Sequence, residues 1–579
     1  MGSKELSCLA CCNERIGEPM NLLGKAHSPE FWTEVRESES YEKYRRELLG
    51  TWERHNKDYH PDCLKYSEFK LFWTTGDRAQ YERPYFHRRA MAENAALLSL
   101  VYPDESKYTE KLMDILYAIC DEYTWCLPAH QGKLEPNNNS RIDLFASETG
   151  YMLAEIDVLL RDRLDPLIHN RIMAETERRI VKPFCGVENY GWWENGNTNW
   201  TAVCMGSVAC TLMLLYPELA DEIFIARANT AMDRFLDGFG PDGICFEGCG
   251  YWGYGFGFFV LYADMVRTYT EGRCDYFKQE RVKRVACFPQ KMFLSGNAGV
   301  SFSDGGRTLG YGIWIMHYLK KEYPDDILVY SPEYASNSAG KFATHLRSAL
   351  WMVREYKDTP ADNSVTTEFF APNAQWFTKR TPYYGFAAKG GHNAEMHNHN
   401  DVGSFIFAKN GKQLLMDLGS GRYTRQYFAA DTRYSILECS SRGHSVPMIG
   451  ENYQLVGSAA RASDFQYENG VLSMDIAGAY RVEGLERIDR SFKLETDSVT
   501  LTDSFVYNGT EQITDRIVSF EKAELVDRCT VRIDSATVSF DPDACDCVIG
   551  TEQTEKGATC YLVDFKLKRG VTVFTCTVR

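Results

Sequence analysis

The chain has 579 residues, of which 44% are hydrophobic and 25% charged, and a formal net charge of −16. Its length exceeds what one ordinary core needs, so we expect two large domains. The acidic balance argues against a broad nucleic-acid or anionic-membrane surface, since both require clustered Lys and Arg, and no apolar run approaches the roughly 18–20 residues that cross a bilayer.

The chain contains 19 cysteines, scattered without regular CxxC pairs. In a long chain this pattern indicates free, small apolar groups in a reducing compartment, not a disulfide framework. The N-terminal segment lacks a basic start followed by a long apolar stretch, so no secretory signal is evident. We therefore expect a soluble, cytoplasmic protein.

Aromatic residues make up 13% of the chain, and many stand beside Gly and Asn. This mixture suits a carbohydrate-binding cleft, in which flat rings stack on sugars and amides bond hydroxyl groups. A large hydrophobic core explains the same composition equally well.

The first part of the chain has helical periodicity. From about residue 28 to 355, apolar residues recur at helical spacing, and Gly-, Asn- and Pro-rich loops join the segments. We expect domain 1–355 to be an incomplete (α/α) toroid of antiparallel helix pairs, whose loops at one rim form a cleft. The clearest predicted helices cover 91–102, 108–123, 148–164, 201–216, 219–239 and 256–270.

The last part has strand periodicity. Asn410-Gly411 lies between the alternating runs 404–408 and 413–417, which is the strongest local signal for a β-hairpin. We predict that domain 360–579 is a large antiparallel β-sandwich, so that the fold class is multidomain α+β. Further strands are expected at 471–476, 480–482, 491–494, 499–501, 513–519, 537–540, 559–565 and 571–578.

The densest group of chemically active side chains is in GGHNAEMHNHNDVGSF. His397, His399 and Asp401 are two residues apart, so on a strand all three would share one face. Asp417 follows at the end of a predicted strand, and His444 stands beside a glycine. Two imidazoles and a carboxylate are a usual ligand set for zinc or a similar divalent ion, so we favour a metal site over an exposed polar strand.

A second group lies in the helical part, in NYGWWENGNTNWTAVC. Asn195, Asn197 and Asn199 precede a predicted helix. Their amide NH₂ groups and the free N–H groups of the helix start can hold a carboxylate without a cation. Helix capping explains the same residues equally well.

A third group is the pair Tyr251 and Tyr254 in EGCGYWGYGFGFF. Three residues apart on one helical turn, they face the same way. They suit a substrate-facing rim, and structural stacking on neighbours is the alternative.

Together these stretches resemble the heparinase II/III-like polysaccharide lyases over essentially the whole chain, most specifically in HNHNDVGSF, LLMDLGSGRY and GHS. The resemblance implies a toroid followed by a β-sandwich and cleavage of an acidic, uronate-containing polysaccharide by β-elimination. It implies that His397 is catalytic and that His399, Asp417 and His444 bind one divalent metal ion. Zinc is the expected ion, with manganese and calcium as alternatives.

The toroid motifs match this family more loosely. The resemblance places Asn199 as the residue that neutralises the substrate carboxylate, and Tyr254 as the catalytic tyrosine, with Tyr251 as second choice. Several members have a histidine where this chain has Trp200, which we expect to contact substrate. Tyr423 falls where some members place an additional active-site tyrosine.

Four further residues are expected to contact substrate: Arg88 and Arg141 as cations, Asn138 shortly before Arg141, and Glu247 in the loop before the two tyrosines. Family members act on heparan sulfate, hyaluronan, chondroitin sulfate or alginate. The chain contains no dense run of Arg and Lys, which favours an unsulfated or lightly sulfated substrate.

Two other functions remain open at the level of sequence. A toroid glycoside hydrolase acting on uronides needs two carboxylates. Candidates for these are Asp143, Glu148, Asp242, Glu247 and Asp304. A non-catalytic carbohydrate-binding protein would explain the aromatics but leave the histidine cluster without a role.

Overall fold

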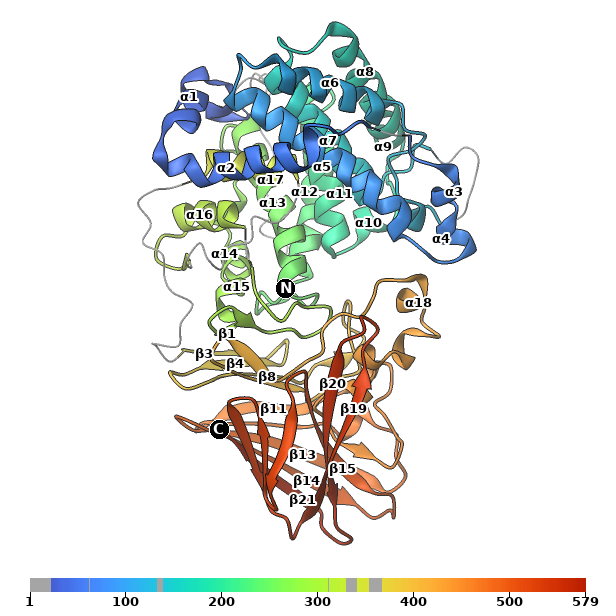
Figure 1. The fold of residues 1–579 in the computed structure, drawn as a ribbon, viewed down its shortest axis with the longest axis vertical. Helices are drawn as coiled ribbons and strands as arrows, with labels where there is room; N and C mark the ends of the chain where they lie inside the picture. Colours follow the sequence, from blue (N-terminus) through green and yellow to red (C-terminus); the bar gives the residue numbers. More distant parts are fainter. Residues whose placement is uncertain (1–21, 62, 133–138, 311, 330–340, 353–366) are drawn as a thin grey trace.

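Helices occupy the first part of the chain and antiparallel sheets the rest (Figure 1). The predicted fold class, an incomplete ring of helices followed by a β-sandwich, is confirmed. The expected boundary between 355 and 360 falls outside the described residues. The computed structural model describes residues 22–61, 63–132, 139–310, 312–329, 341–352 and 367–579.

The helical part is built around α11 (Asn199–Leu215), which packs against α7, α12 and α13. Its residues are buried without interruption from Thr201 to Leu215. A helix that is apolar all round is a buried helix, so its place at the centre follows from its composition. The six predicted helices are found as α5 (Ala79–Val101), α6 (Ser106–Cys120), α7 (Leu144–Leu160), α11, α12 (Glu222–Asp237) and α13 (Cys249–Tyr269).

A five-stranded sheet forms the layer between the helices and the sandwich (Figure 1). Alternate residues of its strands enter two different cores, because successive side chains point to opposite faces. Trp376 and Ile406 join the core of the helical part, whereas Phe377 and Phe407 join the sandwich core. The strand order is β3 (Thr367–Ala371), β4 (Trp376–Arg380), β5 (Gly385–Lys389), β7 (Phe405–Lys409) and β8 (Lys412–Leu415).

The predicted hairpin between β7 and β8 is confirmed. Lys409 pairs with Lys412, and the two residues between them, Asn410 and Gly411, have φ of 52° and 77°. A two-residue hairpin turn of this type requires positive φ at both positions, which Asn and Gly adopt at least cost. The turn brings Asp417 back toward the segment that holds the histidines.

The sandwich consists of an eight-stranded sheet, in the order β11-β12-β13-β14-β21-β18-β17-β16, and a four-stranded sheet, β19-β20-β15-β9. The strand expected at 480–482 is wrong, since these residues follow a short 3₁₀ turn outside any strand. The strands are β9 (Met448–Ile449), β11 (Ser463–Glu468), β12 (Val471–Asp475), β13 (Leu485–Leu494), β14 (Val499–Tyr507), β15 (Ile513–Ser519), β16 (Ala523–Asp527), β17 (Thr530–Ile533), β18 (Ala536–Phe540), β19 (Cys545–Gln553), β20 (Thr559–Leu567) and β21 (Val573–Val578).

Every cysteine in the described part of the chain is a free thiol, as expected. Among the same residues, no helix combines the length and the apolar character needed to span a bilayer.

A buried arginine ties the sandwich to the loops that carry the histidines. The Arg490 guanidinium contacts Asp503 at 2.5 Å and Asp515 at 3.2 Å, and all three side chains are inaccessible to solvent. Its Nη1 also donates to the carbonyl oxygens of Gly403, at 2.9 Å, and Ser445, at 2.8 Å. These two residues follow the histidine cluster and His444, so one cation fixes both loops.

Replacing Arg490 with Met is therefore expected to lower the free energy of unfolding by about 3–5 kcal/mol, because two buried carboxylates lose their counter-ion. Arg487 on the same strand, with a 43% exposed side chain, is the matched control. Arg487→Met should cost less than about 1 kcal/mol, as is usual for exposed ion pairs. Urea denaturation measures both values, and equal losses would contradict the structural role of Arg490.

Candidate active site

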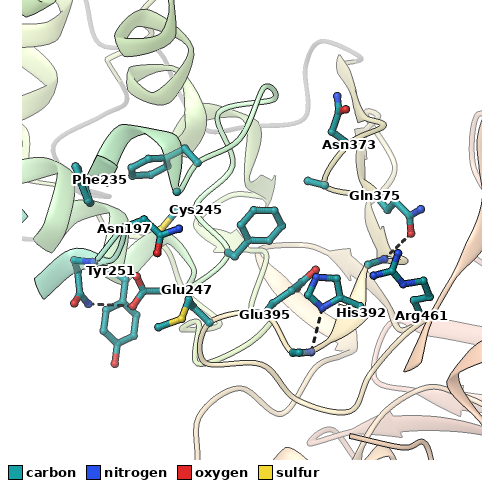
Figure 2. A pocket seen from close by; sticks show the side chains of 18 of the residues that line it. Asn197, Phe235, Cys245, Glu247, Tyr251, Asn373, Gln375, His392, Glu395 and Arg461 are labelled. Carbon is teal, nitrogen blue, oxygen red and sulfur yellow. Dashed lines mark hydrogen bonds between the residues drawn. The ribbon is translucent and has the colours of Figure 1, made fainter. Parts of the chain in front are cut away.

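A cleft of about 450 Å³ lies between the helical ring and the sheets (Figure 2). One wall comes from loops of the ring and the other from β6 (His392–Asn393), β10 (Gly457–Arg461) and the turn before β4. Amides and aromatic rings predominate. The ring wall includes Asn197, Asn199, Phe235, Phe246, Glu247 and Tyr251, and the sheet wall includes Asn373, Gln375, His392, Glu395 and Arg461.

Asn199 is the first residue of α11 and lines the cleft. Helix α13 passes close to it, because a Cβ added to Gly255 would lie 3.0 Å from the Asn199 Cβ. The Asn199 Nδ2 donates to Glu247 at 3.1 Å, and its Oδ1 is buried without a hydrogen-bond partner. The Asn199 backbone N–H also points to Glu247, at 3.5 Å. The acidic side chain of Glu247 thus lies at the helix start that the sequence suggested for a substrate carboxylate.

His397 projects from the sheet side toward these residues. Its Nδ1 lies 2.6 Å from Asp304, and its Nε2 lies 3.5 Å from Glu247. The imidazole stacks on the Tyr251 ring with centroids 4.5 Å apart and a 34° tilt. An imidazole from the sheet part therefore lies against a phenol of the ring, Tyr251, and near Glu247, which bonds the Asn199 amide.

The expected strand through 397–401 is wrong. These residues form turns and loop, and His397 has φ of 54°. Asp401 consequently does not join the histidines: it accepts from the buried ammonium of Lys389 at 2.8 Å. His397 and His399 still converge, because both bond to Asp304.

Asp304 accepts hydrogen bonds from four side chains of the site. It accepts from His397, from His399 Nε2 at 3.2 Å and from the Tyr423 hydroxyl at 2.9 Å, and also from Tyr427. Its side chain has no exposed surface. Burial opposes ionisation, but the hydrogen bonds from the two histidines outweigh it, so the pKa of Asp304 lies well below its ordinary value.

Three buried ligand atoms next to Asp304 could hold a metal. Among the described residues, His399 Nδ1, Asp417 Oδ2 and His444 Nδ1 form no regular hydrogen bond, although His444 Nδ1 lies 3.1 Å from Asp417 Oδ2. The donor atoms of these three residues lie within 4.8 Å of one another. His444 Nε2 bonds the Glu438 carbonyl at 2.8 Å, and His399 Nε2 bonds Asp304. Since each Nε2 then carries the proton, each Nδ1 has a free lone pair for a divalent ion, and the residues fit the expected cofactor.

The two candidate tyrosines point to different places. The Tyr254 hydroxyl bonds Glu148 inside the helical part, and the Lys341 ammonium lies 5.3 Å from the centre of its ring. Tyr254 does not line the cleft, whereas Tyr251 does, and the Tyr251 hydroxyl bonds that of Tyr423 at 2.9 Å. The geometry favours the second-choice tyrosine.

The expected substrate-binding residues separate into three groups. Glu247 and Tyr423 lie in the active site. Arg141 and Trp200 line a different pocket of about 700 Å³, beside Trp192. Arg88 is buried and paired with Glu122 at 2.8 Å, so the prediction that it contacts substrate is wrong. Asn138 lies outside the described residues.

Sequence reasoning missed the central role of Asp304, which entered only as a hydrolase candidate, and the roles of Tyr427 and Arg433. Tyr427 stands four residues after Tyr423 and bonds the same carboxylate. Arg433 Nη2 lies 3.7 Å from Asp304 and donates to the His397 carbonyl at 3.2 Å. One local signal was available, the Gly pair after Asp304, which is typical of a tight loop.

No protein-family model and no curated protein sequence matches the chain. Among solved structures, heparinase III has a TM-score of 0.62 at 14% identity, over 95% of this chain and 91% of that chain. A heparan sulfate lyase from Pedobacter heparinus has 0.58 at 14%, over 96% and 86%. A chondroitin AC lyase from Streptomyces coelicolor, in complex with chondroitin sulphate, has 0.54 at 11%, over 97% and 82%. The chain therefore shares the fold of these proteins.

Metal content tests the ligand assignment. His444→Ala and Asp417→Ala should each lower the bound metal from about one ion per chain to less than a tenth of that, because a three-ligand site does not survive the loss of one ligand. His392→Ala, a cleft histidine outside the three, should leave the content unchanged. Elemental analysis after dialysis gives the values. Wild-type protein without stoichiometric metal would show that the assignment is wrong.

Proposed function

We propose that the protein is a polysaccharide lyase that cleaves a uronate-containing glycan by β-elimination and leaves a 4,5-unsaturated uronate end. The observation that carries the proposal is the position of the His397 imidazole, which stacks on Tyr251 and lies 3.5 Å from Glu247, at a cleft that Tyr251, Glu247 and Asn199 line. Solved structures of this fold include a heparinase, a heparan sulfate lyase and a chondroitin lyase, which supports a glycosaminoglycan-type substrate.

Elimination begins with the C5 proton of the uronate, which is too weakly acidic while the neighbouring carboxylate keeps its full charge. Asn199 is suited to hold that carboxylate. One N–H of its amide bonds Glu247, and the second remains for an oxygen of the substrate. A donor placed where negative charge develops stabilises the enolate-like transition state.

His397 is suited to take the proton. Its Nδ1 bonds the Asp304 carboxylate at 2.6 Å, which keeps the proton on that nitrogen and leaves a lone pair on Nε2. Nε2 points toward Glu247 on the ring wall, and the side chain is 19% exposed, so substrate can reach it.

Tyr251 is suited to protonate the leaving oxygen. Burial raises the pKa of its hydroxyl above the ordinary value, which keeps the phenol protonated at neutral pH. Because its ring stacks on His397, base and acid are adjacent, and the two steps can proceed in one cleft.

The proposed cofactor is a zinc ion at His399, Asp417 and His444, with manganese as the alternative, because two imidazole nitrogens suit these ions better than calcium, which prefers oxygen ligands. When bound, the ion would neutralise Asp417 and fix His399. The hydrogen bond from His399 to Asp304 would then hold the partner of His397 in place.

The glycoside-hydrolase alternative requires two accessible carboxylates. Glu247 and Glu395 line the cleft, but the Glu395 side chain is 5% exposed and its carboxylate lies 3.4 Å from the Lys389 ammonium. The Asp304 side chain has no exposed surface and already accepts from two histidines and two tyrosines, and Glu148 accepts from Tyr254 in the helical part. Asp143 bonds His130, and Asp242 bonds the backbone of Asn373, so neither is free to donate a proton to a glycosidic oxygen.

Replacing His397 with Ala should lower kcat by about 10²- to 10⁴-fold, as is usual for removal of a general base, while the metal content stays at the wild-type level. The measurement is the ultraviolet absorbance of the conjugated C4–C5 double bond, over unsulfated and sulfated uronate polymers. His169→Ala is the matched control, since His169 also bonds a carboxylate, Asp157 at 2.8 Å, but on α8 (Pro166–Thr176), and does not line the cleft. Depolymerisation without this absorbance would identify a hydrolase.

The two tyrosines give a paired test. Tyr251→Phe should lower kcat by about 10²-fold or more, because the leaving oxygen loses its acid. Tyr254→Phe should retain most of the activity and lose stability, since its hydroxyl bonds Glu148 in the helical interior and does not line the cleft. Steady-state kinetics with thermal denaturation separates the two effects. If Tyr254→Phe lowered kcat more than Tyr251→Phe, Tyr254 would be the catalytic tyrosine instead.

A further inference from the structure

Among the described residues that line the active-site cleft, Arg461 carries the one guanidinium. Of the described residues that line it, only Arg461 and His392 are basic, against Glu247 and Glu395. Burial and the charge of Arg461 lower the pKa of His392, which favours its neutral form at pH 7. Arg461 is therefore the strongest fixed positive charge in a cleft proposed to bind an acidic chain.

Arg461 has its guanidinium anchored through Nε, while its two terminal nitrogens point away from this anchor. It ends β10, paired with His392 of β6, and its Nε donates to the Ser458 carbonyl at 2.8 Å. No carboxylate among the described residues forms an ion pair with it, and both terminal nitrogens are left for another acceptor. A guanidinium fixed by Nε and open at Nη1 and Nη2 matches the two oxygens of a carboxylate or a sulfate.

The position of Arg461 separates it from the site of elimination. Figure 2 shows it on the sheet wall beside Gln375 and His392, with Glu247 and Tyr251 on the opposite wall. Asn199 on the ring wall holds the uronate that is cleaved, so a group bound by Arg461 belongs to a different sugar of the same chain.

We propose that Arg461 binds the acidic group of another sugar of the same chain, and that it selects chains carrying one such group at this place. The inference rests on the proposed function and extends it to the substrate class. A densely sulfated chain would bring several anionic groups against one guanidinium and the carboxylates of Glu247 and Glu395. The cleft thus suits an unsulfated or lightly sulfated uronate polymer.

The kinetic test compares Arg461→Gln with Arg532→Gln on an unsulfated uronate polymer. Loss of a charge-assisted, two-point contact should raise KM by about 10- to 100-fold and change kcat by less than about 3-fold. Arg461→Lys should recover part of the loss, because it restores the charge but not the fork. Arg532 is the control, since it is exposed on β17 and paired with Glu524 at 2.8 Å. An unchanged KM for Arg461→Gln would overturn the proposal.

Direct binding identifies the acidic group and does not depend on turnover. In a His397→Ala background, titration calorimetry compares an unsulfated uronate oligosaccharide, its carboxyl-reduced form and a sulfated one. A weaker affinity of Arg461→Gln for the first, with no difference for the carboxyl-reduced form, supports a carboxylate. A difference confined to the sulfated form means that the group is a sulfate and overturns the assignment to unsulfated chains. If the wild type releases no unsaturated product, the proposed function fails, while these titrations still decide whether Arg461 binds an acidic sugar.

Discussion

The site depends on one buried carboxylate. Asp304 comes from the helical part of the chain, yet the side chains that donate hydrogen bonds to it come from the sheet part. They are His397, His399, Tyr423 and Tyr427. A buried carboxylate without hydrogen-bond partners has a high free energy. Separating the two parts at this point would therefore leave the Asp304 charge either exposed to solvent or buried and unpaired. Because one oxygen contacts His397 and the other His399, the same group links the proposed base to the residues that could hold a metal.

The fold supplies this arrangement through a layer that both parts share. The five-stranded sheet contributes alternate side chains to the helical core and to the sandwich core, so the cleft above it cannot open freely. Arg490 then fixes the loops after the two histidine segments through Gly403 and Ser445. Rigid elements of this kind are what a site with a base, an acid and a carboxylate holder requires, since small displacements are costly in rate.

An acidic protein that binds an acidic glycan must confine its positive charge. The net charge is −16, and the cleft contains one guanidinium among the residues that the structure describes. The proposed chemistry is consistent with this scarcity, because the Asn199 amide holds the reacting carboxylate with a neutral donor. The role proposed for Arg461 is recognition of the chain outside the reacting sugar.

Local patterns determined the helix positions and the hairpin at Asn410-Gly411, because periodicity and turn chemistry act over short distances. The set His399, Asp417 and His444 was expected from the resemblance to a known family, and the structure brings these three residues together. The tertiary structure alone decided which tyrosine faces the cleft: residues three apart share a helix face, but Tyr251 lines the cleft and the Tyr254 hydroxyl bonds Glu148 in the helical part. It also decided that Arg88 forms an ion pair with Glu122 and that Asp304 accepts hydrogen bonds from both His397 and His399. Those contacts join segments 34 to 95 residues apart, and no local pattern records such distances.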